Sequence, residues 1–109
     1  RLPQLVGKGK AMELIMTAGM ISAQDAKECG LVNHVVPQEE LLPLAEKIAN
    51  KIMRNSSVAI SAAISAVNAN FKDGVNGFEV EISAFGKCFG TDDFKEGTTA
   101  FLEKRKPDF

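Results

Sequence analysis

Apolar residues recur at helical spacing along most of the chain. Near the start, Ala11, Leu14, Ile15 and Ala18 follow the i, i+3, i+4, i+7 pattern of one helical face. Gly19 comes next, and glycine is common directly after the end of a helix. The pattern therefore predicts a helix of about three turns over residues 8–18, stopped by Gly19.

A shorter helix is predicted between Ser22 and Gly30. Ser22 is a good N-cap, Asp25 stands where a capping box needs it, and Gly30 suits the position just past a helix end. Residues 31–36 (LVNHVV) form a β-branched run bounded by a glycine and a proline. They are predicted to be a short strand or an extended segment.

A longer helix is predicted after Pro37. Pro43 lies within it, and proline is tolerated in a first helical turn because no internal N–H bond is lost there. We therefore expect one turn over residues 39–42 and then the main helix, beginning near Pro43. Its apolar positions repeat over three turns: Leu41, Leu44, Ala45, Ile48, Ala49 and Ile52.

Three more helices follow, each with an apolar stripe. The first has Ser56 or Ser57 as its N-cap and ends at the turn residues Asp73 and Gly74, and the last has Thr91 as its cap. The whole pattern predicts a mainly α-helical array of five or six helices. The three stripes are Ile60, Ile64, Val67 and Phe71; Phe78, Ile82, Phe85 and Phe89; and Phe94, Thr98 and Phe101.

The composition is that of a soluble globular chain, and 109 residues form one domain at most. Lys plus Arg number 13 against 14 Asp plus Glu, so no broad field attracts nucleic acid or an anionic membrane. Neither a membrane-spanning apolar run nor a leader pattern is present, so we expect a cytoplasmic protein. Because the first residue is Arg1 rather than Met, we expect a processed, cloned or proteolysed part of a longer protein.

The cysteines, the single histidine and the lysine-rich segment near the start do not indicate a metal, redox or phosphate site. Cys29 and Cys88 lack a C-x-x-C pair or a histidine at metal-ligand spacing, so we interpret them as idle thiols and expect no metal. His34 stands alone in an apolar stretch, which favours a structural residue. Residues 7–10 (GKGK) lack the spacing of a phosphate loop, and a helix start with solvated lysines is the better interpretation.

Carboxylates occur in close pairs, but residues one or two apart point in different directions on a helix. We therefore interpret these pairs as capping and solubilising groups rather than as an acid and a base. No G-x-S-x-G motif is present either. The residues by themselves indicate no catalytic constellation. The pairs are Glu39 and Glu40, Glu79 and Glu81, and Asp92 and Asp93.

The C-terminal stretch AFLEKRKPDF combines a ring with several cations. Phe101 and Lys104 are three residues apart, so on a helix they would be neighbours, and a ring and an ammonium suit an adenine and a phosphate. Alternatively, Phe101 continues the stripe of Phe94 into a core, while Lys104, Arg105 and Lys106 offset the negative helix end. Spacing alone favours this second interpretation.

Longer segments resemble a known family. RLPQLVGKGKAMEL, ISAQDAKECGLVNHVVP, TDDFKEG and AFLEKRKPDF occur in the order and at the spacing of the crotonase family, and the likeness to its enoyl-CoA hydratases covers essentially all 109 residues. The family's fold is an α/β spiral of ββα repeats followed by a helical C-terminal region that packs trimers, often paired into hexamers. The resemblance implies that residues 1–36 are the end of that core and residues 37–109 the helical trimerisation region.

The resemblance also implies a function. The family's hydratases add water to a 2-enoyl-CoA to give a 3-hydroxyacyl-CoA in fatty-acid metabolism, with a CoA thioester as substrate and no metal. Both catalytic glutamates and both oxyanion-hole N–H groups of the family lie upstream of residue 1, so the chain alone is expected to be inactive. Fragments of an enoyl-CoA isomerase or of another acyl-CoA enzyme of the family, and a non-catalytic helical interaction module, remain alternatives.

Two residues of the tail match family positions. The Phe and Lys of the family's F-x-E-K lie near the adenine and phosphate of CoA bound to a neighbouring subunit, and they correspond to Phe101 and Lys104. The resemblance therefore reverses the preference for these two residues, though not for Arg105 or Lys106. One departure is Ala18, which stands where the family usually has glycine.

Overall fold

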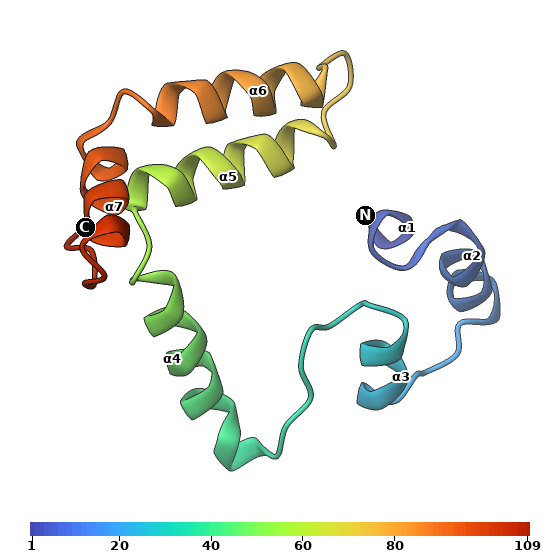
Figure 1. Cartoon of the computed structure of the whole chain (residues 1–109). Coiled ribbons are helices and arrows are strands. Elements are labelled where there is room, and N and C mark those ends of the chain that lie inside the picture. The colour runs from blue at the N-terminus through green and yellow to red at the C-terminus, as the bar shows by residue number, and fades with distance from the viewer. The chain divides into compact units, whose positions relative to one another are not determined.

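The structure is a computed structural model that describes residues 1–109, the whole chain (Figure 1). It consists of seven α-helices and one short 3-10 helix and contains no β-strand. The predicted mainly α-helical class is therefore confirmed. The chain divides into two compact units, residues 1–43 and residues 44–109. No helix is both long and apolar enough to cross a lipid bilayer.

The first unit begins with a short helix that the hydrophobic pattern did not predict. Helix α1 (Leu2–Val6) has only five residues, too few to show a helical repeat, and carries a proline in its first turn. Gly7 follows with a φ of 80°, a left-handed conformation that glycine adopts at no steric cost. This turn brings α1 against α2 (Lys8–Thr17), so that residues 7–10 are a helix start, as predicted.

Helix α2 ends one residue earlier than predicted. Ala18, which we placed on the helical face, lies beyond the helix with a φ of 49° and a ψ of 26°, and Gly19 is not the residue in the left-handed conformation. The physical reason lies in Thr17, whose hydroxyl donates to the Glu13 carbonyl at 2.8 Å and accepts from the Gly19 N–H at 3.4 Å. An alanine therefore takes the conformation that glycine favours.

Helix α3 (Ala23–Glu28) has the predicted ends. Ser22 and Asp25 form a complete capping box, each side chain accepting from the other's backbone N–H. Gly30 has a φ of 78°, and the Leu31 N–H donates to the Ala26 carbonyl at 2.8 Å, which closes a Schellman turn. Local side-chain chemistry therefore determines this helix.

Residues 31–36 form no strand, because no second segment pairs with them; they are an irregular link with bends at Leu31 and Asn33, so the strand alternative was wrong. A 3-10 turn, η1 (Gln38–Glu40), leads into α4 (Leu41–Ile52), with Pro43 in its first turn as predicted. The division we predicted at residues 36 and 37 separates regions of a family's fold rather than compact units, and it stays a prediction.

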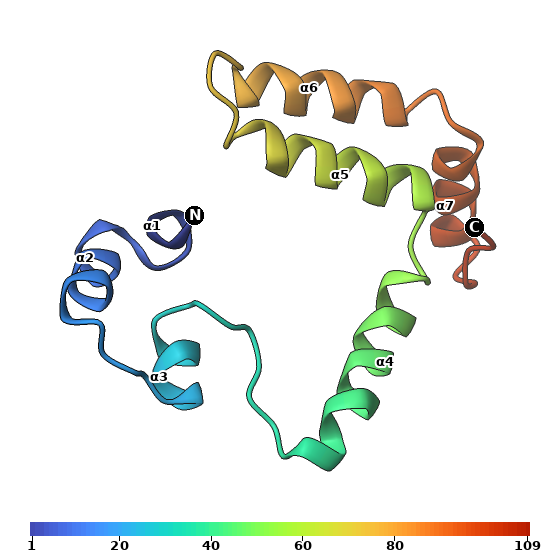
Figure 2. The ribbon, with the colours of Figure 1, turned by 180° about the vertical axis from the view of Figure 1, so that it is seen from behind.

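In the second unit, α5 (Ser57–Ala69) and α6 (Gly77–Cys88) lie side by side and antiparallel, as both views show (Figures 1 and 2). The seam between them is built from small residues. A Cβ added at Gly77 would lie only 3.2 Å from the Cα of Asn70, so the backbones approach closely there. The less exposed positions along the two helices are Ile60, Ala62, Ala66, Ala69, Gly77, Val80, Ala84 and Cys88.

Because small residues fill most of the seam, most of the large apolar residues of α5 and α6 remain at the surface. Phe78 is 77% exposed and Phe85 is 66% exposed. The only buried hydrophobic residues of the chain are alanines. We call the exposed set on α6 and its C-cap residue the α6 stripe; it comprises Phe78, Ile82, Phe85 and Phe89.

The last helix, α7 (Asp92–Leu102), is joined to the start of α5 by a polar contact. Thr91 caps α7, and Ser56 caps α5 by accepting from the Ala59 N–H at 3.0 Å. The Ser56 hydroxyl also donates to a carboxylate oxygen of Asp93 at 2.5 Å, and Ser56 is buried. The Thr91 cap was predicted, and Ser56 was one of the two caps considered for α5, whereas the contact with Asp93, 37 residues away, was not predicted.

Candidate functional site

The candidate site lies at the C-terminal end of α7, within the second unit. Phe101 is the penultimate residue of the helix and 82% exposed, and Leu102 is the last. Lys104 lies beyond the helix end with a φ of 55°. The expectation that Phe101 and Lys104 share a helical face was therefore wrong, because the helix stops between them.

Hydrogen bonds close the turn around Lys104 in the pattern of a Schellman motif. The Lys104 N–H donates to the Phe101 carbonyl at 3.3 Å, and the Arg105 N–H donates to the carbonyl of buried Ala100 at 3.0 Å. Glycine usually occupies the left-handed position of this motif. A lysine in that place is uncommon, and its side chain projects from a backbone held on both sides.

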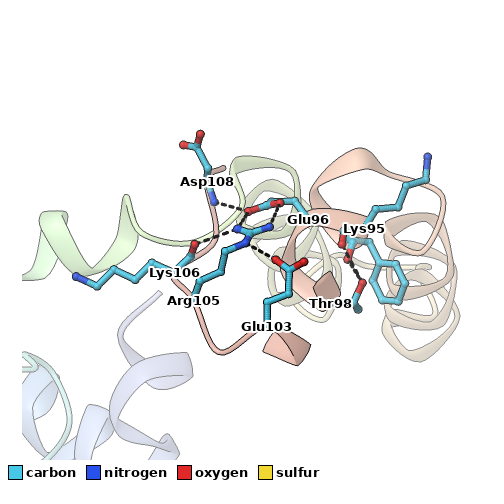
Figure 3. Close-up of polar contacts among 8 residues, drawn as sticks. Lys95, Glu96, Thr98, Glu103, Arg105, Lys106 and Asp108 are labelled. Atoms are coloured by element: carbon cyan, nitrogen blue, oxygen red, sulfur yellow. Dashed lines mark hydrogen bonds and ion pairs between the residues drawn. The ribbon is translucent and has the colours of Figure 1, made fainter. Parts of the chain in front are cut away.

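Arg105 ties the tail back onto α7 (Figure 3). Its guanidinium forms a bidentate ion pair with Glu96, at 2.5 and 2.9 Å, and its Nε donates to Glu103 at 2.7 Å. The backbone N–H of Asp108 donates to the same Glu96 carboxylate at 2.7 Å. We call these four residues the tail clasp.

The clasp stabilises the charged forms of its members. Hydrogen bonds from Arg105 and from the Asp108 N–H lower the pKa of Glu96 to about 2. The Glu96 carboxylate, followed by that of Glu103, raises the pKa of Arg105 above its already high value. The side chains of Arg105 and Glu96 are 40% and 25% exposed, so solvent screens their attraction and the geometry matters more than the energy.

The alternative interpretation of the tail was wrong. Phe101 does not follow Phe94 into a core: Phe94 packs against the Phe89 ring, with 4.6 Å between ring centroids, whereas Phe101 points to solvent. No basic residue lies in the last turn of α7. Lys104 forms neither an ion pair nor a side-chain hydrogen bond. A ring and an unpaired ammonium are thus exposed at the end of one helix, and their contact with CoA stays a prediction.

Other candidate residues do not gather into a site. Cys29 and Cys88 are half-buried free thiols, and His34, which we interpreted as structural, is exposed and belongs to no core. No group of three His, Cys, Asp or Glu side chains could hold a metal ion. Lys10 pairs with Glu13 at 3.1 Å on the surface of α2. Only the end of α7 therefore presents an exposed ring and an unpaired ammonium on a turn that backbone hydrogen bonds hold.

Comparison with known proteins decides the family. The sequence profile described as "Enoyl-CoA hydratase/isomerase" matches residues 1–109. The chain belongs to the enoyl-CoA hydratase/isomerase family. This membership confirms the resemblance drawn from the four quoted segments. The chain also matches the solved structure of an enoyl-CoA hydratase from Bacillus anthracis with a TM-score of 0.91 and 44% identity. The match covers 99% of this chain and 42% of that one.

Relatives within the family carry hydratase names. The chain is 47% identical to a crotonyl-CoA hydratase of Syntrophomonas wolfei, covering 100% of this chain and 42% of that protein. It is 46% identical to the mitochondrial enoyl-CoA hydratase of Pongo abelii, covering 100% of this chain and 38% of that protein. The chain thus spans about two-fifths of the length of these relatives.

Proposed function

We propose that this chain is the C-terminal part of an enoyl-CoA hydratase that converts a 2-enoyl-CoA into a 3-hydroxyacyl-CoA. Its role there is to contact CoA and to hold subunits together. The observation that carries the proposal is the match over all 109 residues to hydratase-named proteins of more than twice the length. In this proposal, the remaining three-fifths of such a protein contains the catalytic groups.

Hydration needs groups that this chain does not bring together. Water addition to an enoyl thioester calls for donors to the developing oxyanion and for carboxylates that orient water and transfer a proton. Here Asp92 pairs with Lys95, Asp93 accepts from Ser56, and Glu96 is held by Arg105. The proposal therefore assigns the catalytic glutamates to the rest of the enzyme.

An assay of the isolated chain tests this division of labour. The 109-residue chain, given crotonyl-CoA, should cause no loss of the enoyl absorbance beyond that in buffer. Hydration that follows the concentration of the chain would overturn the assignment of the chemistry to another part of the protein. Because the chain contains neither Trp nor Tyr, CoA absorbance is followed almost without background.

The amount of exposed surface supports a role in assembly. The chain exposes 8978 Å². A compact monomer of 11.7 kDa would expose about 5,900 Å², and two separate globules of 43 and 66 residues would expose roughly 7,000 Å². Many large hydrophobic residues are exposed, among them the α6 stripe. We propose that the rest of the enzyme and neighbouring subunits, in a trimer or a pair of trimers, cover these residues.

The proposed CoA contact rests on Phe101 and Lys104. The exposed ring stacks on the adenine and the unpaired ammonium meets a phosphate, on a CoA bound mainly by a neighbouring subunit. In the intact enzyme, Lys104→Ala should weaken CoA binding several-fold. Lys106→Ala removes the same charge two residues away and should leave the affinity unchanged. Equal affinities in both variants would remove Lys104 from the site.

The family description also covers isomerases, so isomerisation of a 3-enoyl-CoA to a 2-enoyl-CoA is the second candidate. The intact enzyme distinguishes the two reactions directly. A hydratase converts crotonyl-CoA to the 3-hydroxy product, whereas an isomerase leaves it unchanged and moves the double bond of a 3-enoyl-CoA. A protein that catalysed neither reaction would favour the non-catalytic interaction module.

A further inference from the structure

We propose that the ion pair between Arg105 and Glu96 is a positioning element for the nucleotide end of CoA. It touches no ligand itself. It acts by holding Lys104 and Phe101 in the arrangement that meets the phosphate and the adenine. This inference rests on the proposed function, in which those two residues contact CoA.

The geometry begins at the backbone on either side of Lys104. The Lys104 N–H is bonded to the Phe101 carbonyl, and the next N–H, that of Arg105, is bonded to the Ala100 carbonyl. The Arg105 side chain extends from this turn to Glu96, where Nη1 and Nη2 each donate to one carboxylate oxygen. The residue after Lys104 is thus anchored through both its backbone and its side chain, while the Lys104 ammonium has no partner.

The clasp matters because the conformation of Lys104 is not one that lysine prefers. A non-glycine residue with a φ of 55° is strained and persists where surrounding contacts hold it. Two further hydrogen bonds hold the residues after Arg105. The Asp108 N–H donates to the Glu96 carboxylate, and Arg105 Nη1 donates to the Lys106 carbonyl. Without the clasp, Lys104 would sample many positions, and ligand binding would have to order it.

A truncated substrate separates this role from general structural damage. Crotonyl-pantetheine carries the reacting thioester but lacks the adenine and the phosphates of the nucleotide. In the intact enzyme, Arg105→Ala should raise the KM for crotonyl-CoA about three- to tenfold and leave the KM for crotonyl-pantetheine unchanged. Loss of folding or of the active site would raise both values or lower kcat for both substrates.

Three further variants sharpen the test. Glu96→Gln removes the same ion pair from α7 and should reproduce the selective effect of Arg105→Ala. Arg105→Lys keeps the charge but loses the bidentate fork, so its effect should be intermediate. Lys95→Ala is the matched control, because it breaks an exposed ion pair with Asp92 on the same helix without touching the tail. It should leave both substrates unaffected.

The outcomes distinguish this inference from the function on which it rests. If Lys104→Ala impairs only crotonyl-CoA but Arg105→Ala and Glu96→Gln impair neither substrate or both equally, the positioning role is wrong and the CoA contact stands. If Lys104→Ala also fails to discriminate between the substrates, the CoA contact itself is wrong. Should Arg105→Ala fail to fold, Arg105→Lys and Glu96→Gln decide the question in the same assay.

Discussion

A single charge in the middle of the α6 stripe should prevent self-association of this chain. Phe85 is 66% exposed, which corresponds to about 130 Å² of a ring that offers roughly 200 Å². Burying that area against another molecule contributes about 3 kcal/mol at about 25 cal/mol per Å². Phe85→Glu forfeits this term and adds a carboxylate to desolvate, so association should weaken about a hundredfold or more.

Sedimentation velocity or light scattering of the 109-residue chain over a range of concentrations measures this effect. The unmodified chain should associate as its concentration rises, and Phe85→Glu should remain monomeric. Ser83→Glu is the matched control, since it adds the same charge to the same helix outside the stripe. An unmodified chain that stays monomeric throughout, or a Phe85→Glu variant that associates as the unmodified chain does, would refute the reasoning.

Three other expectations concern stability and pH. Ala18→Gly should raise the free energy of unfolding by about 0.5–1 kcal/mol in a urea titration, because glycine removes the strain at a φ of 49°; a loss of stability would contradict this. Ser56→Ala should cost about 1–2 kcal/mol as a buried cap is lost, whereas Ser57→Ala should change little, and equal effects would contradict the assignment. The pKa of Glu96 is lowered from 4.5 to about 2, so its ion pair with Arg105 contributes stability above about pH 4.5 and loses it as pH falls towards 2. The 13C NMR signal of the Glu96 carboxylate carbon should titrate with a midpoint near pH 2, and a midpoint near 4.5 would show that the pair does not form in solution.

Local features of the fold were predictable because they depend on neighbouring residues. The residues that form these features lie within four positions of each helix end. They are the capping box of Ser22 and Asp25, the glycine turn at Gly30 and the caps at Ser56 and Thr91. The end of α7 was not predictable in this way. No glycine follows Leu102, and the left-handed turn falls on Lys104.

Contacts between residues far apart in the sequence could not be predicted from the sequence alone. The repeat identified the α6 stripe as one face of a helix, but it could not show that alanines and Gly77 would form the seam and leave the rings exposed. Glu96 was likewise missed, because its pairing with Arg105 depends on the reversal of the tail after the helix end. Pro107 was the one local sign that the helix could not continue.

The most direct test of the account is the kinetic effect of Lys104→Ala in the intact enzyme with crotonyl-CoA. In the proposed function, this chain contacts CoA and the rest of the protein carries out the chemistry. The proposal therefore predicts that KM rises about fivefold or more while kcat stays within about twofold, the sign of lost binding that is uniform between ground state and transition state. An unchanged KM, or a fall in kcat with KM unaltered, would contradict it.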